Sequence, residues 1–210
     1  MSALIVGLTG SLASGKSTVG ALFEKWGAVR IDADELARIA VEPGSDAFLR
    51  IRARFGEDVI ADDGTLDRSA IRRIVFGDAG ARTFLEATVH PEVMRLRSAR
   101  HEAAIRAGAR LIVDEVPLLF ETGLDAFTDV TVVVDAPIAA RRERALAARG
   151  WTVAEFEAIE SSQLDPSRKR GRADHVILNE GSLDELEARA RLVWSRLADH
   201  GAVDRSQPSA

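Results

Sequence analysis

Near the N-terminus of this chain, eight residues have the types and spacing of a phosphate-binding loop. Residues 10–17 read Gly-Ser-Leu-Ala-Ser-Gly-Lys-Ser and fit G-x-x-x-x-G-K-[ST] at every defined position. In such a loop, backbone N–H groups and the start of the following helix bind phosphate oxygens. Lys16 then reaches the β- and γ-phosphates, and the Ser17 hydroxyl ligates the Mg²⁺ that bridges them. The pattern therefore predicts ATP and Mg²⁺ as cofactors.

The flanking sequence favours this interpretation over an ordinary Gly/Ser turn. Residues 3–8 are a short apolar run typical of a buried strand, and the apolar residues of segment 16–26 have helical spacing. A strand before the loop and a helix after it are the required context. The expected nucleotide contacts are Gly10, Ser11, Leu12, Ala13, Ser14, Gly15, Lys16, Ser17 and Thr18.

An acidic residue ends a later strand. Asp114 follows the apolar run 111–113, and an acid at such a position holds Mg²⁺ directly or through water in nucleotide-binding proteins. We therefore expect Ser17 and Asp114 to bind the metal. Many buried strands end in aspartate, so a structural role for Asp114 stays open.

Two further carboxylates follow the second predicted strand. The carboxyl ends of parallel strands meet at one edge of a sheet, so Asp32 and Asp34 should lie on the same edge as the phosphate loop. Asp32 and Glu35 have capping-box spacing, which makes a helix cap at Asp32 an equal alternative. We prefer Asp34 as the acid that faces the acceptor, with a simple cap as the alternative.

Arginines that could neutralise transferring phosphate lie after the fourth predicted strand. They are Arg141, Arg142, Arg144 and Arg149, and a second basic cluster occupies residues 168–172. Charged helix faces are usually solvated, but a mobile flap carrying arginines would exclude water from the reaction. We expect one or two of these arginines to be functional.

Two more segments have both a structural and a functional interpretation. His90-Pro91 is expected to interrupt a helical region, and His90 either lies beside the break or contacts the acceptor. Residues 117–121, Pro-Leu-Leu-Phe-Glu, either line an acceptor pocket or belong to the core.

The scaffold that positions these residues is an α/β fold. Strands alternate with helices, which indicates a parallel sheet covered on both faces, and residues 34–107 are expected to be mainly helical. Capping-box spacing starts helices near Thr152 and Ser182, and the last helix runs to about residue 200. The five strands are predicted at residues 3–8, 28–31, 110–113, 131–134 and 175–178.

Composition excludes several classes of protein. The 210 residues suit one domain or one domain with an insertion. A net charge of −5 gives no reason to expect binding to nucleic acid or to an anionic membrane. The chain has no cysteine, which excludes disulfides and thiolate chemistry. We see no leader peptide and no apolar segment of about 20 residues, so we expect a cytoplasmic location.

A phosphate loop alone does not separate a kinase from a switch. The chain has no Asn-Lys-x-Asp motif for guanine recognition and no Asp-x-x-Gly after a strand, which argues against a GTPase. A small-molecule kinase needs an acceptor pocket, a carboxylate near the acceptor hydroxyl and cations, and each has candidates above.

Together these motifs resemble the dephospho-CoA kinase family, and the similarity extends from Leu4 to the last helix. Beyond the phosphate loop it is carried by segments 7–10, 32–38, 41–44, 55–56, 63–68, 90–91, 116–121 and 173–174, and by Phe76, Arg144, Gln163, Asn179 and Gly181.

The resemblance implies phosphorylation of the ribose 3′-hydroxyl of dephospho-coenzyme A by ATP, the last step of coenzyme A synthesis. It implies a P-loop kinase core over residues 1–203 with a five-stranded parallel sheet, an acceptor-binding helical region at about 34–107 and a lid at about 137–172, before a frayed tail at 204–210. We expect a monomer or a weak homo-oligomer.

The resemblance also implies roles for single residues. Asp34 is the catalytic acid at the acceptor hydroxyl, Lys16 and Arg144 steady the phosphates, and Asn179 lies near the adenine of ATP. The acceptor-binding residues are Thr9, Asp34, Arg38, His90, Pro117 and Leu118.

The chain departs from the family pattern in its loop and its lid. Ser11 and Ala13 replace two glycines, and a side chain costs about 1 kcal/mol or more wherever φ must be positive. In the lid, Ile159 stands where the family often has arginine. The alternatives are another small-molecule or nucleoside kinase, and an ATP-binding regulator whose altered loop has lost transferase activity.

Overall fold

The computed structural model describes residues 3–149 and 151–203, and the chain divides into two compact units. The sheet unit takes the chain up to Ile31 and again from Ala103 onward, and the helical unit spans Asp32–Glu102. The tail at residues 204–210, which we predicted to be frayed, lies outside the described residues.

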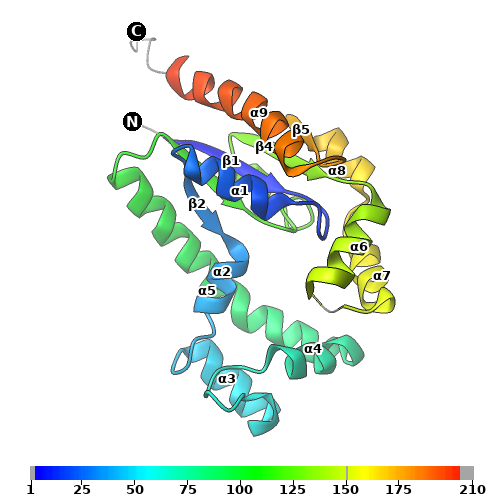
Figure 1. Ribbon diagram of the computed structural model, residues 1–210. Coiled ribbons are helices and arrows are strands. Elements are labelled where there is room, and N and C mark those ends of the chain that lie inside the picture. Colours follow the sequence, from blue (N-terminus) through cyan, green and yellow to red (C-terminus); the bar gives the residue numbers. More distant parts are fainter. Residues whose placement is uncertain (1–2, 150, 204–210) are drawn as a thin grey trace. The chain divides into compact units, whose positions relative to one another are not determined.

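The sheet unit is built on five strands in the order β2-β3-β1-β4-β5 (Figure 1). The central strand β1 (Leu4–Thr9) pairs in parallel with β3 (Leu111–Glu115) and β4 (Val130–Asp135). At the two edges, β5 (His175–Leu178) pairs in parallel with β4, and β2 (Val29–Asp32) lies beside β3. The predicted parallel sheet is confirmed, but β3 runs two residues beyond its predicted end and so includes Glu115.

Two long helices of the sheet unit pack together. α1 (Lys16–Lys25) contacts α9 (Leu183–Val203), and α9 in turn contacts β5. Phe23 is fully buried, and its ring centroid lies 6.0 Å from that of Trp26 and 5.6 Å from that of Trp194. This aromatic cluster lies at the C-terminal end of α1 and, together with buried Val and Leu side chains of the strands, forms the core that packs α1 against the sheet.

Three further helices follow β4 along the chain. α6 (Ile138–Arg149) packs against α7 (Val153–Ser162), and α8 (Pro166–Arg172) packs against β4. Thr152 and Glu155 form the expected capping box at the start of α7. A short 3₁₀ helix, η2 (Leu124–Phe127), lies between β3 and β4.

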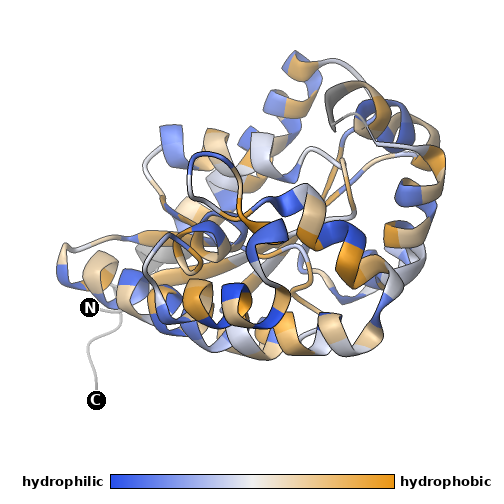
Figure 2. Cartoon of the chain, turned by 90° about the horizontal axis from the view of Figure 1, so that it is seen from below, coloured by the Kyte–Doolittle hydropathy of each residue, from blue (hydrophilic) through white to orange (hydrophobic). Residues whose placement is uncertain are grey.

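The helical unit confirms the prediction of a mainly helical segment. It contains α2 (Ala33–Ile39), α3 (Asp46–Phe55), the 3₁₀ helix η1 (Glu57–Val59), α4 (Arg68–Gly77) and most of α5 (Ala79–Arg106). Its own core gathers Phe48, Ile51, Val59, Leu66 and Ile71. Its helices, like those of the sheet unit, carry both hydrophobic and hydrophilic stretches (Figure 2), as expected for helices with one buried face.

The expected interruption at His90-Pro91 is wrong, because α5 continues through Pro91. Proline removes one backbone donor, and that loss is tolerated here within a helix of 28 residues. Among the described residues, no helix is both long enough and apolar enough to cross a membrane.

Candidate active site

The loop between β1 and α1 has a turned backbone that is open toward the start of α1. Ser14 N–H donates to the Ser11 carbonyl over 3.1 Å, and Gly15 adopts φ 96° as the residue before the helix. No side chain caps this helix terminus. The first N–H groups of α1 are therefore oriented toward the loop, where they can bind phosphate oxygens.

The two replaced glycines of the loop differ in their backbone conformation. Ala13 has φ 57°, in the left-handed region, whereas Ser11 does not have a positive φ. A side chain in that region costs about 1–2 kcal/mol, because Cβ crowds the following carbonyl. The expected cost therefore falls on Ala13 alone.

The two glycines that the loop retains are required by close packing. A Cβ at Gly10 would lie 2.4 Å from the Val134 carbonyl oxygen, and a Cβ at Gly15 would lie 2.4 Å from Asn179 Nδ2. At Gly10 the obstacle is backbone, so any larger residue would displace the loop from the end of β4. At Gly15 a larger residue would push the Asn179 side chain away and would also be strained by the φ of 96°.

Lys16 and Ser17 converge on one buried carboxylate. Glu115 Oε1 accepts from Lys16 Nζ at 2.5 Å and from Ser17 Oγ at 2.7 Å. Its other oxygen, Oε2, accepts from Arg30 Nε at 2.7 Å and lies 2.6 Å from another guanidinium nitrogen of Arg30. Burial raises the pKa of the Glu115 carboxyl, but Lys16, Ser17 and Arg30 outweigh burial and hold that pKa below its ordinary value. Glu115 is therefore ionised at neutral pH.

Glu115 takes the position at which we expected Asp114. Successive side chains of a strand point to opposite faces of the sheet, so Asp114, which is also buried, does not share the face on which Glu115 meets Ser17. Glu115 was not predicted as a site residue, because the predicted strand ended at residue 113, two residues before the end of β3. The usable signal was that the acidic pair Asp114-Glu115 continues the apolar run, so the register of β3 decides which acid faces the loop.

Arg144 and Asn179 contact the backbone of the loop at Ala13 and Ser14. Arg144 Nη1 donates to the Ala13 carbonyl at 3.4 Å, and its Nη2 donates to the backbone and side-chain oxygens of Asn179 at 3.4 and 3.5 Å. Asn179 Nδ2 donates to the Ser14 carbonyl at 2.8 Å. The structure thus brings both predicted nucleotide contacts to the phosphate loop.

Thr9 and Pro117 meet at the end of β1. The Thr9 hydroxyl donates to the Pro117 carbonyl at 3.1 Å, and Lys169 Nζ donates to the same carbonyl at 3.4 Å. Lys169 is fully buried and also lies 2.8 Å from Glu121 Oε1. The next residue after Pro117, Leu118, is exposed. From the sequence, Lys169 was predicted only as part of the basic cluster 168–172, and its contacts with Pro117 and Glu121 were not predicted.

The predicted acceptor residues Asp34, Arg38 and His90 all belong to the helical unit and are exposed. Asp32 caps α2, since its Oδ1 accepts from the N–H groups of Asp34 and Glu35 at 2.9 and 3.4 Å. The carboxylate of Asp34 is not needed for that cap, and it stands on the first turn of α2 with Arg38 four residues later.

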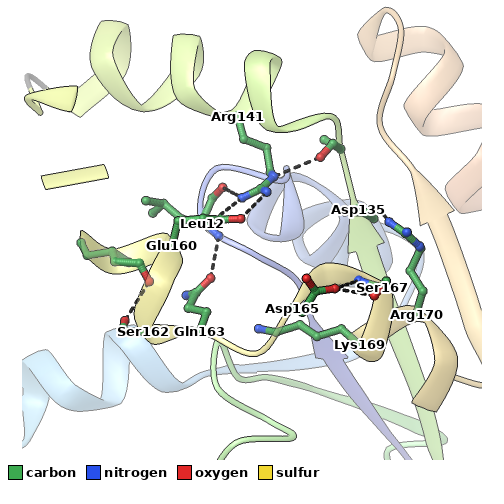
Figure 3. Close-up of polar contacts among 12 residues, drawn as sticks. Leu12, Asp135, Arg141, Glu160, Ser162, Gln163, Asp165, Ser167, Lys169 and Arg170 are labelled. Carbon is green, nitrogen blue, oxygen red and sulfur yellow. Dashed lines mark hydrogen bonds and ion pairs between the residues drawn. The ribbon is translucent and has the colours of Figure 1, made fainter. Parts of the chain in front are cut away.

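The remaining predicted arginines have different environments (Figure 3). Arg141 is buried and forms two hydrogen bonds of 2.6 Å with Glu160, whereas Arg142 is exposed. Arg170 pairs with Asp135. The side chain of Arg149 lies outside the described residues. Arg141, Glu160, Asp135 and Arg170 are among the residues that line a cavity of about 600 Å³ in the sheet unit.

Comparison with known proteins gives one consistent family. The family model described as dephospho-CoA kinase matches residues 4–185. A dephospho-CoA kinase of Moorella thermoacetica is 41% identical over 201 residues, which covers 95% of each chain. A dephospho-CoA kinase of Anaeromyxobacter dehalogenans is 43% identical over 207 residues, covering 98% of this chain and 97% of the relative.

Solved structures agree with the fold. A crystal structure of a Thermus thermophilus protein is 40% identical, has a TM-score of 0.78 and covers 94% of this chain and 99% of its own. The structure of dephospho-CoA kinase from Campylobacter jejuni is 23% identical with a TM-score of 0.69, and its likeness covers 93% of this chain and 98% of that chain. At that identity the second likeness speaks for the fold alone.

Proposed function

The chain belongs to the dephospho-CoA kinase family, and we propose that its phosphate loop, Glu115, Arg144 and Asn179 form the nucleotide half of the active site. The protein is an ATP-dependent phosphotransferase that phosphorylates the 3′-hydroxyl of dephospho-CoA, which completes coenzyme A synthesis. The observation that carries the assignment of the nucleotide site is the convergence of Lys16 and Ser17 on buried Glu115 beside the open end of α1.

Lys16 has two partners in this proposal. Without nucleotide it is held by Glu115, and with ATP its ammonium group turns to the β- and γ-phosphates. Arg144 is near enough to the Ala13 carbonyl to add a second positive charge beside the loop. Cations at these positions stabilise the negative charge of the transferring phosphoryl group.

The oxygen atoms around Ser17 fit Mg²⁺. Hydroxyl and carboxylate oxygens are the ligands this ion prefers, and Ser17 Oγ and Glu115 Oε1 lie 2.7 Å apart. We propose that Ser17 ligates the ion and that Glu115, in place of Asp114, holds it through water. Mg²⁺ bound with ATP neutralises charge on the β- and γ-phosphates.

For the acceptor, we propose that Asp34 orients the 3′-hydroxyl and accepts its proton. Two observations support this role. Segment 32–38 matches the family pattern, and Asp32 caps α2, which leaves the exposed carboxylate of Asp34 available for the acceptor. Arg38 and His90 of the helical unit, and Thr9, Pro117 and Leu118 of the sheet unit, are the proposed acceptor contacts.

A coupled ADP-release assay with ATP, Mg²⁺ and dephospho-CoA tests these roles. We expect acceptor-dependent release that Lys16→Ala abolishes and that Asp34→Asn lowers by about 10²-fold or more while ATP still binds. Asp46→Asn, which removes an exposed carboxylate from the first turn of α3, is the matched control and should keep full turnover.

Two results would count against the proposal. Near-normal turnover of Asp34→Asn would remove Asp34 from catalysis. ATP binding without any acceptor-dependent ADP release from the unaltered chain would favour a regulator, and thermal stabilisation by ATP but not by dephospho-CoA would support that alternative.

We also propose that the enzyme works in the cytoplasm, as a monomer or weak homo-oligomer, without membrane or nucleic-acid partners. Light scattering after size exclusion tests the assembly state, and fractionation of cells tests the location.

A further inference from the structure

The backbone of Leu12, inside the phosphate loop, is held at both of its polar groups by side chains from outside the loop (Figure 3). Leu12 N–H donates to Gln163 Oε1 at 3.2 Å, and the Leu12 carbonyl accepts from Arg141 Nη1 at 3.4 Å. Gln163 is the residue that ends α7, and Arg141 belongs to α6. The loop is therefore fastened to two helices that lie more than 120 residues later in the chain.

Arg141 is itself fixed. Its side chain is almost fully buried, Nε donates to the Ala136 carbonyl at 3.0 Å, and both terminal nitrogens bond Glu160 at 2.6 Å. A planar guanidinium that is paired in two places cannot turn without losing both bonds. Arg141 is thus oriented by Glu160 of α7 as it bonds the Leu12 carbonyl.

The residue next to Leu12 is the one with a strained backbone. Ala13 has φ 57°, a conformation that alanine adopts only when its surroundings impose it. The bond from Gln163 restrains the peptide group before Leu12, and the bond from Arg141 restrains the peptide group between Leu12 and Ala13. Arg144 also bonds the Ala13 carbonyl, so the strained residue is restrained before and after its own φ angle.

We propose that Gln163, Arg141 and Glu160 are positioning residues that hold Ala13 in its left-handed conformation and thereby keep the phosphate loop in its ATP-binding shape. We call these three side chains the clamp. Glycine at position 13 would adopt the left-handed conformation without strain, whereas Ala13 is held in it by the contacts of the clamp. Affinity for ATP then depends on whether α7 is in place. The proposal rests on the nucleotide site proposed above and adds a device that tunes that site.

Combining loop and clamp substitutions separates this role from simple packing. The measurement is the dissociation constant of a non-hydrolysable ATP analogue with Mg²⁺, made on Gln163→Leu, Ala13→Gly and the chain with both changes. Gln163→Leu removes the acceptor for Leu12 N–H at nearly constant volume. We expect it to weaken binding about tenfold when Ala13 is present and about twofold or less when Ala13→Gly is also present, because glycine needs no restraint there.

Steady-state kinetics supply a second readout. A positioning role raises KM for ATP in Gln163→Leu and leaves kcat within about twofold at saturating ATP. Ser162→Ala, which removes a hydroxyl that donates to the Ile159 carbonyl within the same turn of α7, is the matched control and should change neither constant.

Glu160→Gln is the second variant, with exposed Glu157→Gln as its control. This substitution removes the charged partner of Arg141 without altering the sequence of the loop. It should therefore weaken binding of the analogue when Ala13 is present and much less when Ala13→Gly is also present. The variant tests the proposal even where Gln163→Leu fails to fold. Equal losses of affinity with and without Ala13→Gly, or no loss in either variant, would overturn the clamp.

Because the analogue assay uses no acceptor, its outcome is separate from that of the kinase assay. A chain that binds the analogue as expected but transfers no phosphoryl group would keep the clamp and overturn the proposed acceptor roles.

Discussion

The Nζ atom of Lys16 lies 2.5 Å from Oε1 of Glu115, which joins the first residue of α1 to the last residue of β3. Both side chains are nearly inaccessible to solvent. Glu115 therefore fixes the position of the Lys16 ammonium group, and its carboxylate also accepts hydrogen bonds from Ser17 and Arg30. In the function proposed above, ATP binding exchanges Glu115 for the β- and γ-phosphates as the anionic partner of Lys16.

Replacement of Glu115 should destabilise the protein strongly. Glu115→Gln leaves Lys16 and Arg30 without their shared charge in a buried setting, and breaking such a buried pair costs about 3 kcal/mol or more. Urea unfolding measures the loss. Glu57→Gln, which breaks an exposed pair with Arg52, is the control and should cost less than about 1 kcal/mol. A Glu115→Gln chain as stable as the control would show that the buried cluster contributes nothing.

The same carboxylate predicts a pH dependence of stability. Its pKa is lower in the folded chain than in the unfolded chain, because Lys16, Ser17 and Arg30 outweigh burial. A group of this kind stabilises the fold above its unfolded pKa, and that contribution is lost as pH falls through its folded pKa. Unfolding free energy measured from pH 7 down to about pH 3 should therefore fall less steeply in Glu115→Gln. Parallel curves for the two chains would contradict the assignment.

We expect ATP binding to depend on the hydrogen bond that Asn179 donates rather than on the size of its side chain. Asn179→Asp keeps the size of the side chain but replaces the N–H₂ that bonds the Ser14 carbonyl with an oxygen. A buried acceptor left without its donor costs about 1–3 kcal/mol, so we expect KM for ATP to rise by about tenfold or more. Exposed Glu180→Gln next to it should change KM by less than twofold. Unchanged ATP binding in Asn179→Asp would show that the loop holds its shape without this bond.

Asp32 and Asp34 should separate stability from turnover. Asp32→Ala removes the N-cap of α2 and should lower unfolding free energy by about 1 kcal/mol, whereas Asp32→Asn keeps a capping oxygen and should lose little. Asp34→Asn should leave stability nearly unchanged and lower turnover instead. Urea unfolding and the ADP-release assay, run on all three variants, give both quantities. A stability loss in Asp34→Asn equal to that in Asp32→Ala would show that Asp34 is mainly a structural residue.

The order of elements and the phosphate loop were predictable from the sequence because both depend on neighbours in the chain. Apolar runs and capping residues define each strand and helix locally, and the ends of the five strands differ from the predicted ends by at most two residues. The loop is recognisable since its eight residues act together as one backbone unit.

Small differences between predicted and observed strand ends nevertheless changed which residue faces the phosphate loop. The predicted strand ended at residue 113, whereas β3 continues to Glu115. Side chains alternate along a strand, so this difference changes which of the two adjacent acids faces Ser17. His90-Pro91 was expected to interrupt a helix, but α5 continues through Pro91. The low helix propensity of one proline is overridden by the rest of this long helix.

The remaining features arise only from the tertiary structure. Glu115 lies 99 residues from Lys16, and Gln163 lies 151 residues from Leu12. Such contacts depend on which strands become neighbours and on where the helices after β4 pack, and no local pattern encodes that arrangement. The amino-acid sequence was enough to predict a phosphate-binding loop on an α/β scaffold. The side chains that contact this loop could be identified only in the folded chain, because these contacts require distant segments to be brought within hydrogen-bonding distance.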